Sequence, residues 1–170
     1  LNITKLAYID SLTGIPNRAY LNEKINEEHE LAQVKKNMYG VFFIDLDRFK
    51  IINDIYGHLV GDLLLKQVAR RIRKVLPRKA TLSRMGGDEF LVLMPDLNAV
   101  SEAEKCATTI LEVFTNFFQI NEHELYVNGS VGFAIFPLDG VSPSVLLKHA
   151  DLALHRAKDH GGNNIQQYRV

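Results

Sequence analysis

The chain has 170 residues, of which 46% are hydrophobic and 24% are charged, and these values fit one globular domain with its own core. Twenty Lys and Arg residues balance twenty Asp and Glu residues, which argues against nucleic acid or an anionic membrane as the main partner. No apolar run reaches the roughly 20 residues of a membrane span and no signal segment opens the chain, so we expect a cytoplasmic domain. Because it begins at Leu1 without a Met, we expect a piece of a longer protein, whose missing segments could carry a membrane anchor.

The chain opens with a linker, a loop and a helix. Residues 1–9 are weakly helical, and residues 10–17 contain the Gly, Pro, Asn and Ser that are typical of a loop. Residues 1–16 therefore lead into the domain proper. Asn17 is expected to cap a helix that reaches Lys36. The apolar residues expected on the buried face of this helix are Leu21, Ile25, Leu31 and Val34.

A buried strand and two helices follow. Residues 39–44 form an apolar run rich in β-branched and aromatic side chains, which predicts a central strand covered on both faces. Asp47 is placed to cap a short helix over 48–54. A longer helix is expected over 60–76, and Pro77 ends it.

The second half of the chain mixes strands and helices without strict alternation. Two short strands, 81–85 and 89–94, are separated by Gly86-Gly87-Asp88, which predicts a hairpin because glycine accepts positive φ freely. The remaining expected elements are a helix over 98–117, a strand over 125–136, a helix over 142–160 that Gly161-Gly162 stops, and a last strand over 165–169. This order predicts a two-layer α+β domain with a central, mainly antiparallel five-stranded sheet flanked by helices.

Two carboxylates follow the buried strand. Asp45 and Asp47 are two residues apart and so lie on one side of an extended chain. Asp47 is explained either as the helix cap or as a metal ligand. Asp45 has no such local role, and a charge at the end of a buried strand is costly unless a cation or hydrogen-bond donors compensate it. Carboxylate oxygens are the ligands that Mg²⁺ prefers.

The hairpin turn carries two further carboxylates, Asp88 and Glu89. Alone, such a turn is usually a solvated hairpin tip. If the hairpin lies beside the strand that ends in Asp45, the three carboxylates form a cation cluster of the kind that organises phosphate chemistry.

Several separate motifs, in the same order, resemble those of the GGDEF domains, which are diguanylate cyclases, and the resemblance spans nearly the whole chain. The matching segments are residues 10–18 (DSLTGIPNR), 43–54 (FIDLDRFKIIND), 56–58 (YGH), 61–62 (GD), 84–90 (RMGGDEF), 150–151 (AD) and 157–158 (AK). The family fold is similar to that of class III nucleotide cyclases and of the palm of some polymerases.

The resemblance implies a site for Mg²⁺ or Mn²⁺. The metal ligands that it implies are Asp45, the backbone carbonyl of Leu46 and Asp88, with Glu89 beside them as a further ligand or proton acceptor. Gly86 and Gly87 lack side chains and so let the backbone approach the phosphates.

The resemblance also implies a GTP site. Asn53 and Asp62 would recognise guanine, because a carboxylate accepts from its N1–H and amino group while an amide meets its other edge. Phe49 belongs to the same substrate-binding set, and Lys50 and Lys158 are the candidate phosphate clamps. Taken without the family, Asn53 ends the short helix, Asp62 lies in the first turn of the next one, and the lysines are solvated.

In this family each domain holds one GTP and supplies half of a site, so a second GGDEF domain in a transient homodimer is the expected partner. Two GTP molecules then give cyclic di-GMP and pyrophosphate. Sensory or EAL phosphodiesterase domains are the expected neighbours in the full-length protein. The alternative is a catalytically weak or inactive GTP-binding domain that regulates such an attached enzyme.

The sequence departs from the family at two places. The inhibitory product site of many members is an Arg-x-x-Asp tetrad, and here Pro77-Arg78-Lys79-Ala80 occupies its place, which predicts no product inhibition through this site. Four residues after Lys158 the family usually has an Arg, and here Gly162 stands instead. Losing that bidentate cation should weaken triphosphate binding.

Overall fold

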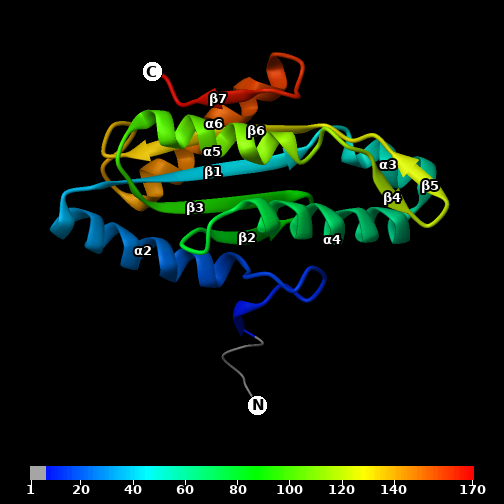
Figure 1. The fold of residues 1–170 in the computed structure, drawn as a ribbon, viewed down its shortest axis with the longest axis horizontal. Coiled ribbons are helices and arrows are strands. Elements are labelled where there is room, and N and C mark those ends of the chain that lie inside the picture. Colours follow the sequence, from blue (N-terminus) through cyan, green and yellow to red (C-terminus); the bar gives the residue numbers. More distant parts are fainter. Residues whose placement is uncertain (1–6) are drawn as a thin grey trace.

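A five-stranded sheet organises residues 7–170, the part of the chain that the computed structural model describes. Its strand order is β2-β3-β1-β6-β7 (Figure 1), and every neighbouring pair is antiparallel except β6 and β7. The bounds are β1 Met38–Leu46, β2 Thr81–Gly86, β3 Glu89–Leu97, β6 Gly129–Phe136 and β7 Ile165–Gln167. The predicted α+β fold with a mainly antiparallel sheet is confirmed, and β1 is the central strand.

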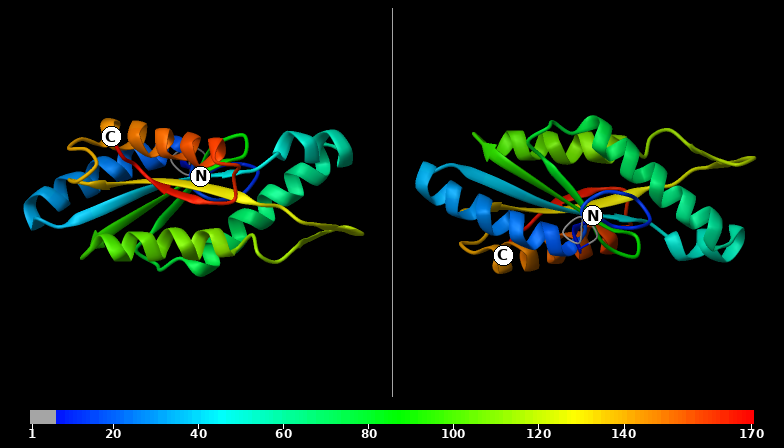
Figure 2. Two further views of the ribbon diagram at one scale, coloured as in Figure 1. Left: turned by 90° about the horizontal axis from the view of Figure 1, so that it is seen from above. Right: turned by 90° about the horizontal axis from the view of Figure 1, so that it is seen from below.

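Helices cover both faces of this sheet. Helices α2 and α6 lie on one face and α4 and α5 on the other (Figure 2), while α3 and the start of α4 extend past the sheet where β1 ends. The bounds are α2 Arg18–Lys35, α3 Phe49–Tyr56, α4 His58–Val75, α5 Val100–Glu112 and α6 Pro143–Asp159. Asn17 caps α2 as expected, since its side-chain oxygen accepts a hydrogen bond of 3.1 Å from the N–H of Tyr20.

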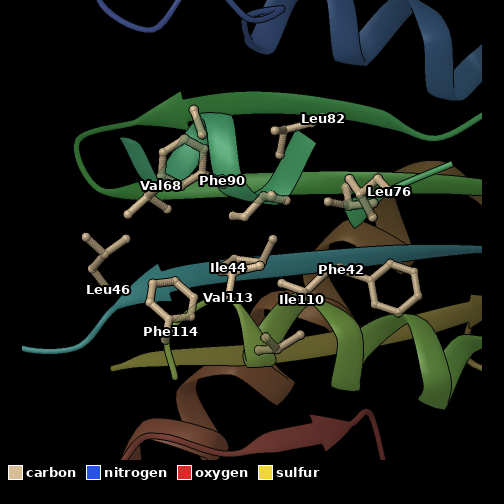
Figure 3. Close-up of a cluster of buried hydrophobic side chains, with 14 of the residues drawn as sticks. Phe42, Ile44, Leu46, Val68, Leu76, Leu82, Phe90, Ile110, Val113 and Phe114 are labelled. Atoms are coloured by element: carbon tan, nitrogen blue, oxygen red, sulfur yellow. The ribbon is translucent and has the colours of Figure 1, made fainter. Parts of the chain in front are cut away.

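The two faces of β1 explain its apolar run. Phe42, Ile44 and Leu46 point to the face of α4 and α5, where they join one buried cluster (Figure 3). Val41 and Phe43 point to the face of α2 and α6 and join a second cluster. Because side chains alternate along a strand, Asp45 lies on the second face, at the point where the apolar cluster gives way to polar groups.

The predicted buried face of α2 is partly wrong. Leu21 and Ile25 are buried, but Leu31 is 47% exposed and Val34 is 82% exposed, while Ala32 is buried. At about 100° per residue, position 32 returns to within about 20° of position 21, whereas position 34 lies on the far side of the helix. The buried face of α2 is therefore completed by the small residue Ala32 and not by the larger Leu31 and Val34.

The region between α5 and β6 also differs from expectation. Helix α5 ends at Glu112 rather than near residue 117, and the strand expected over 125–136 is divided. A small hairpin of β4 (Phe118–Ile120) and β5 (His123–Leu125) precedes β6. Its tight turn places Asn121 at φ 53. Strands of three residues offer too little alternation for a sequence pattern to separate them from a longer strand.

The weak helix expected over residues 1–9 lies mostly outside the described residues, which begin at Ala7; Ala7 and Tyr8 are helical and Ile9 is not. Across residues 7–170, each helix is too short or too polar to cross a membrane.

Candidate active site

The sheet brings carboxylates from two strands together. Asp45, near the end of β1, is the Cα partner of Glu89 at the start of β3. Residues directly opposite one another on antiparallel strands point to the same face, which here is the face of α2 and α6. Asp88 precedes Glu89 in the β2–β3 turn, so the sheet register itself places the hairpin turn beside the end of β1.

Asp45 has an incomplete polar environment. Its Oδ2 lies 3.4 Å from Nζ of Lys158 on α6, whereas its Oδ1 is buried and has no hydrogen-bond partner. Burial raises the pKa of Asp45 above its usual range, and the adjacent Asp88 carboxyl raises it further, while Lys158 lowers it. A buried oxygen without a donor, beside a second carboxyl, is the environment that a cation would stabilise.

The turn that carries Asp88 is braced by Arg84. Gly86 and Gly87 both adopt positive φ, at 146° and 52°, which residues with side chains rarely adopt. The Arg84 guanidinium donates to the Gly87 carbonyl from Nε at 2.9 Å and from Nη2 at 2.8 Å. Its Nη1 donates to the Asp10 carboxylate at 3.2 Å. The loop before α2 therefore holds the turn through one arginine.

Asp10 is set up for this contact by its own loop. Its Oδ2 accepts hydrogen bonds from the N–H and hydroxyl of Thr13 at 2.9 and 2.7 Å. Although burial acts in the opposite direction, these bonds and the charge of Arg84 lower the pKa of Asp10. No role was predicted from the sequence for Asp10 or for Arg84. The available signal was that both motifs containing them place a charge beside a glycine turn.

Asp47 is not the cap of α3. Arg48 occupies the cap position at φ 58 and no side chain caps the helix. Instead, the Asp47 carboxylate accepts hydrogen bonds from the Ser130 hydroxyl at 2.7 Å and from the Asn163 N–H at 2.8 Å. It also lies 3.3 Å from Nζ of Lys158. The Asp47 side chain therefore contacts β6, α6 and the turn after α6 rather than the start of α3, so the cap interpretation is wrong.

Glu89 lies opposite Asp45 and is partly buried. Burial raises its pKa, as does the charge of Asp151, while Arg18 lowers it. Within residues 7–170, no three His, Cys, Asp or Glu side chains gather closely enough to hold a metal ion by themselves. The three-carboxylate cluster expected from sequence is therefore a close pair, Asp45 and Asp88, with Glu89 beside it. A cation here would also need backbone oxygen, and Leu46 is the adjacent residue of β1.

The residues expected to read guanine lie where α3 meets α4. A Cβ placed on Gly61 would lie 1.9 Å from Asn53 Oδ1 and 3.2 Å from Phe49 Cζ, so these two side chains crowd a position that only glycine fills. Asn53 Oδ1 is buried and has no hydrogen-bond partner. Asp62 is exposed and is the fifth residue of α4, beyond its first turn. The first-turn explanation for Asp62 is therefore wrong.

The two candidate phosphate lysines differ. Lys50 is exposed on α3. The Lys158 side chain is 32% exposed and lies between Asp45 and Asp47. Two cavities adjoin this position. One of about 320 Å³ is lined by residues that include Asp47, Arg48 and Tyr126, and one of about 270 Å³ by residues that include Lys158 and Gly162.

The sequence of this chain is similar to those of known proteins. The sequence model described as "Diguanylate cyclase, GGDEF domain" matches residues 7–164. The bifunctional diguanylate cyclase/cyclic di-GMP phosphodiesterase MucR of Pseudomonas aeruginosa is 38% identical over 95% of this chain and 23% of its own length. The cyclic di-GMP phosphodiesterase PdeR of Escherichia coli is 41% identical over 92% of this chain and 23% of its own length. The chain thus spans about a quarter or less of these relatives.

Solved structures agree with the sequence comparison. The GGDEF domain of PA1120 (YfiN or TpbB) from Pseudomonas aeruginosa superposes with a TM-score of 0.91 at 31% identity, and the match covers 93% of this chain and 99% of that one. The strand register that brings Asp45 to Glu89 and the Gly86-Gly87 turn lie within the matched region. The chain belongs to the diguanylate cyclase, GGDEF domain family.

Proposed function

We propose that this GGDEF domain is an active diguanylate cyclase, which condenses two GTP molecules into cyclic di-GMP and pyrophosphate. One observation carries the proposal. Asp45 has a buried oxygen with no hydrogen-bond partner beside the Asp88 carboxyl, next to a turn where nothing lies within 4 Å of a Cβ built on Gly86 or Gly87. Such a pair is unfavourable for folding alone and favourable once a cation is present.

The residues fit a divalent cation. Asp45, Asp88 and the carbonyl of Leu46 would hold Mg²⁺ or Mn²⁺, with Glu89 as a further ligand or proton acceptor. When bound, the cation neutralises the triphosphate, stabilises charge on the transferring phosphoryl group and lowers the pKa of the attacking hydroxyl. Gly86 and Gly87 give the phosphates access to backbone N–H groups.

The substrate residues orient GTP around this point. Asn53 and Asp62 would read guanine with Phe49 beside them, and Lys50 and Lys158 would bind phosphate oxygens. The 3′-oxygen of each GTP then bonds to the α-phosphorus of the other, so that two phosphodiester bonds form. The bond from each α-phosphorus to the oxygen that bridges it to the β-phosphorus breaks, two pyrophosphate ions leave, and Glu89 of each domain would accept one hydroxyl proton.

The reaction needs two domains, because one domain holds one GTP. A transient homodimer brings the two nucleotides together, and the rate depends on how often the dimer forms. Sensory or EAL domains in the full-length protein would control that step, and the cytoplasm is the expected location. The resemblance to MucR, which combines cyclase and phosphodiesterase activity by its name, supports an attached EAL domain.

A second function is favoured by Gly162. Without the arginine usual at this position, the domain could bind GTP and regulate an attached phosphodiesterase rather than catalyse. The likeness to PdeR, which is named as a phosphodiesterase, supports the same role. The intact turn from Gly86 to Phe90, which carries Asp88 and Glu89 beside Asp45, favours the cyclase more strongly.

One experiment separates the two functions. The chain is fused to a leucine zipper that forces dimers and incubated with GTP and Mg²⁺ or Mn²⁺, and the products are separated by chromatography. Cyclic di-GMP in the dimer, at a rate far above that of the unfused chain, supports the cyclase. Bound GTP without product would select the regulatory domain, and no bound GTP would contradict both.

A further inference from the structure

Asp47 connects four parts of the fold around Lys158. Its side chain is 16% exposed. It accepts from Ser130 of β6 at 2.7 Å and from the N–H of Asn163, after α6, at 2.8 Å. Its own N–H donates to the carbonyl of Asn128 at 2.8 Å. Lys158 Nζ lies 3.3 Å from the same Oδ1 that Ser130 contacts. This carboxylate is fixed by two donors that do not belong to the lysine.

Gly162 lets the turn after α6 approach Asp47 closely. A Cβ at position 162 would lie 2.7 Å from Asp47 Oδ2 and 2.9 Å from its Cγ, and the residue has φ +75°. A side chain there meets both a strained backbone and the carboxylate. A side chain at 162 would therefore require the Asp47 carboxylate to shift from the position it has here.

Lys158 lies near two carboxylates that a bound cation would affect differently. Its ammonium lies 3.4 Å from Asp45 and 3.3 Å from Asp47. A flexible four-carbon stem does not hold a direction by itself. A cation bound to Asp45 would neutralise the first carboxylate, whereas Asp47 keeps its charge because its other partners are neutral donors.

We propose that Asp47 is a positioning residue, which holds the ammonium of Lys158 toward the β- and γ-phosphates of GTP in place of the second cation that position 162 lacks. The proposal rests on the proposed function, since it requires a triphosphate at this site. The competing explanation is structural only: Asp47 ties the turn after α6 to β6 and has no effect on the ligand.

Binding of a GTP analogue with a non-cleavable α,β-methylene bridge, measured by calorimetry with Mg²⁺, tests the inference without turnover. Asp47→Asn keeps one acceptor oxygen for the Asn163 N–H, and its amide NH₂ can donate to the Ser130 hydroxyl, but the change removes the charge that holds Lys158. We expect Kd to rise about tenfold, as for loss of one charged contact, and Lys158→Met to have a similar effect. The double variant should bind no worse than Lys158→Met, because both changes act through one ammonium.

Two controls separate positioning from structure. GMP has the base but no β- or γ-phosphate, so its affinity should not change in Asp47→Asn. Asp96→Asn, at the far end of β3 and exposed, removes a charge and should bind both ligands normally. If Asp47→Asn weakens GMP as much as the analogue, or leaves both unchanged, the positioning role is wrong.

Should Asp47→Asn not fold, Ser130→Ala removes one donor that fixes Asp47, and an unchanged Kd for the analogue there would overturn the inference, whereas a rise of about threefold supports it. Failure of the proposed function looks different: the unmodified chain would then not bind the analogue at all.

Discussion

The two ends of the candidate site are built in different ways. At the carboxylate end, Asp45 and Glu89 are Cα partners on adjacent strands. Arg84 links the β2–β3 turn to the loop that contains Asp10. At the guanine end, Asn53 and Phe49 are held on α3, an eight-residue helix none of whose residues is fully buried. One end is set by backbone pairing in the sheet and the other by contact between two helices.

This difference determines what each end tolerates. Hydrogen-bonded strands cannot move independently, so the carboxylates keep their spacing, and chemistry at that end depends on which charges are present. The guanine end depends on shape, because α3 approaches α4 over a glycine. We therefore expect charge changes to act at the first end and size changes at the second.

The largest effect is expected at the carboxylate end. Asp88→Asn keeps the size of the side chain but removes one of the paired negative charges, and turnover should fall by about 10³-fold or more. The measurement is cyclic di-GMP formation by the zipper dimer, with Asp96→Asn as the matched control. Unchanged rates in Asp88→Asn would mean that the metal assignment is wrong.

The contrast between the ends also explains what the sequence could predict. The strand before Asp45 and the hairpin at Gly86-Gly87 are continuous patterns, so their register followed once the sheet order was known. The partners of Asp47 could not be found in this way, because Ser130 and Asn163 are distant in sequence and neither carries a distinctive pattern. Capping was the only local role available, and it was wrong because tertiary contacts take precedence over local propensity.

A large effect on stability is expected at Gly132 of β6, where α6 rests on the sheet. A Cβ there would lie 2.0 Å from the backbone N of Leu154 and 2.5 Å from its Cα, and a backbone cannot rotate away as a side chain can. Gly132→Ala should destabilise the fold by about 3 kcal/mol, seen as a lower Tm.

The matched substitution is Gly140→Ala, whose Cβ would contact only the flexible side chains of Val145 and Leu146 at 3.0–3.3 Å. It should change Tm little. Helix α6 brings Lys158 to the carboxylates. A stable Gly132→Ala protein with normal activity would therefore show that the close packing of α6 on β6 does not determine the geometry of the carboxylate end of the site.

A smaller and more selective effect is expected at Gly61. Gly61→Ala places a methyl group 1.9 Å from Asn53 Oδ1, so the Asn53 side chain must turn away while the fold survives. We expect KM for GTP to rise about tenfold with kcat changed less, the pattern of lost uniform binding. Steady-state kinetics measure this. Lys66→Ala, at an exposed position five residues further along α4, should have no such effect, and equal KM values in both variants would show that guanine does not bind beside Gly61.

The smallest effect is expected when cyclic di-GMP, the proposed product, is added to the reaction. The segment Pro77-Arg78-Lys79-Ala80 borders a cavity of about 510 Å³ between α2 and β2. The residues that line this cavity include Lys35, Arg73 and Arg78. Arg73 already donates to the carbonyls of Ala80 and Pro77, and Ala80 offers no carboxylate to accept from a guanine edge. Phosphate attraction alone is a weak and unspecific basis for inhibition. Initial rates of the zipper dimer should therefore stay constant as cyclic di-GMP is added, and a fall at micromolar product would show that this basic cavity serves as an inhibitory site without the acidic residue.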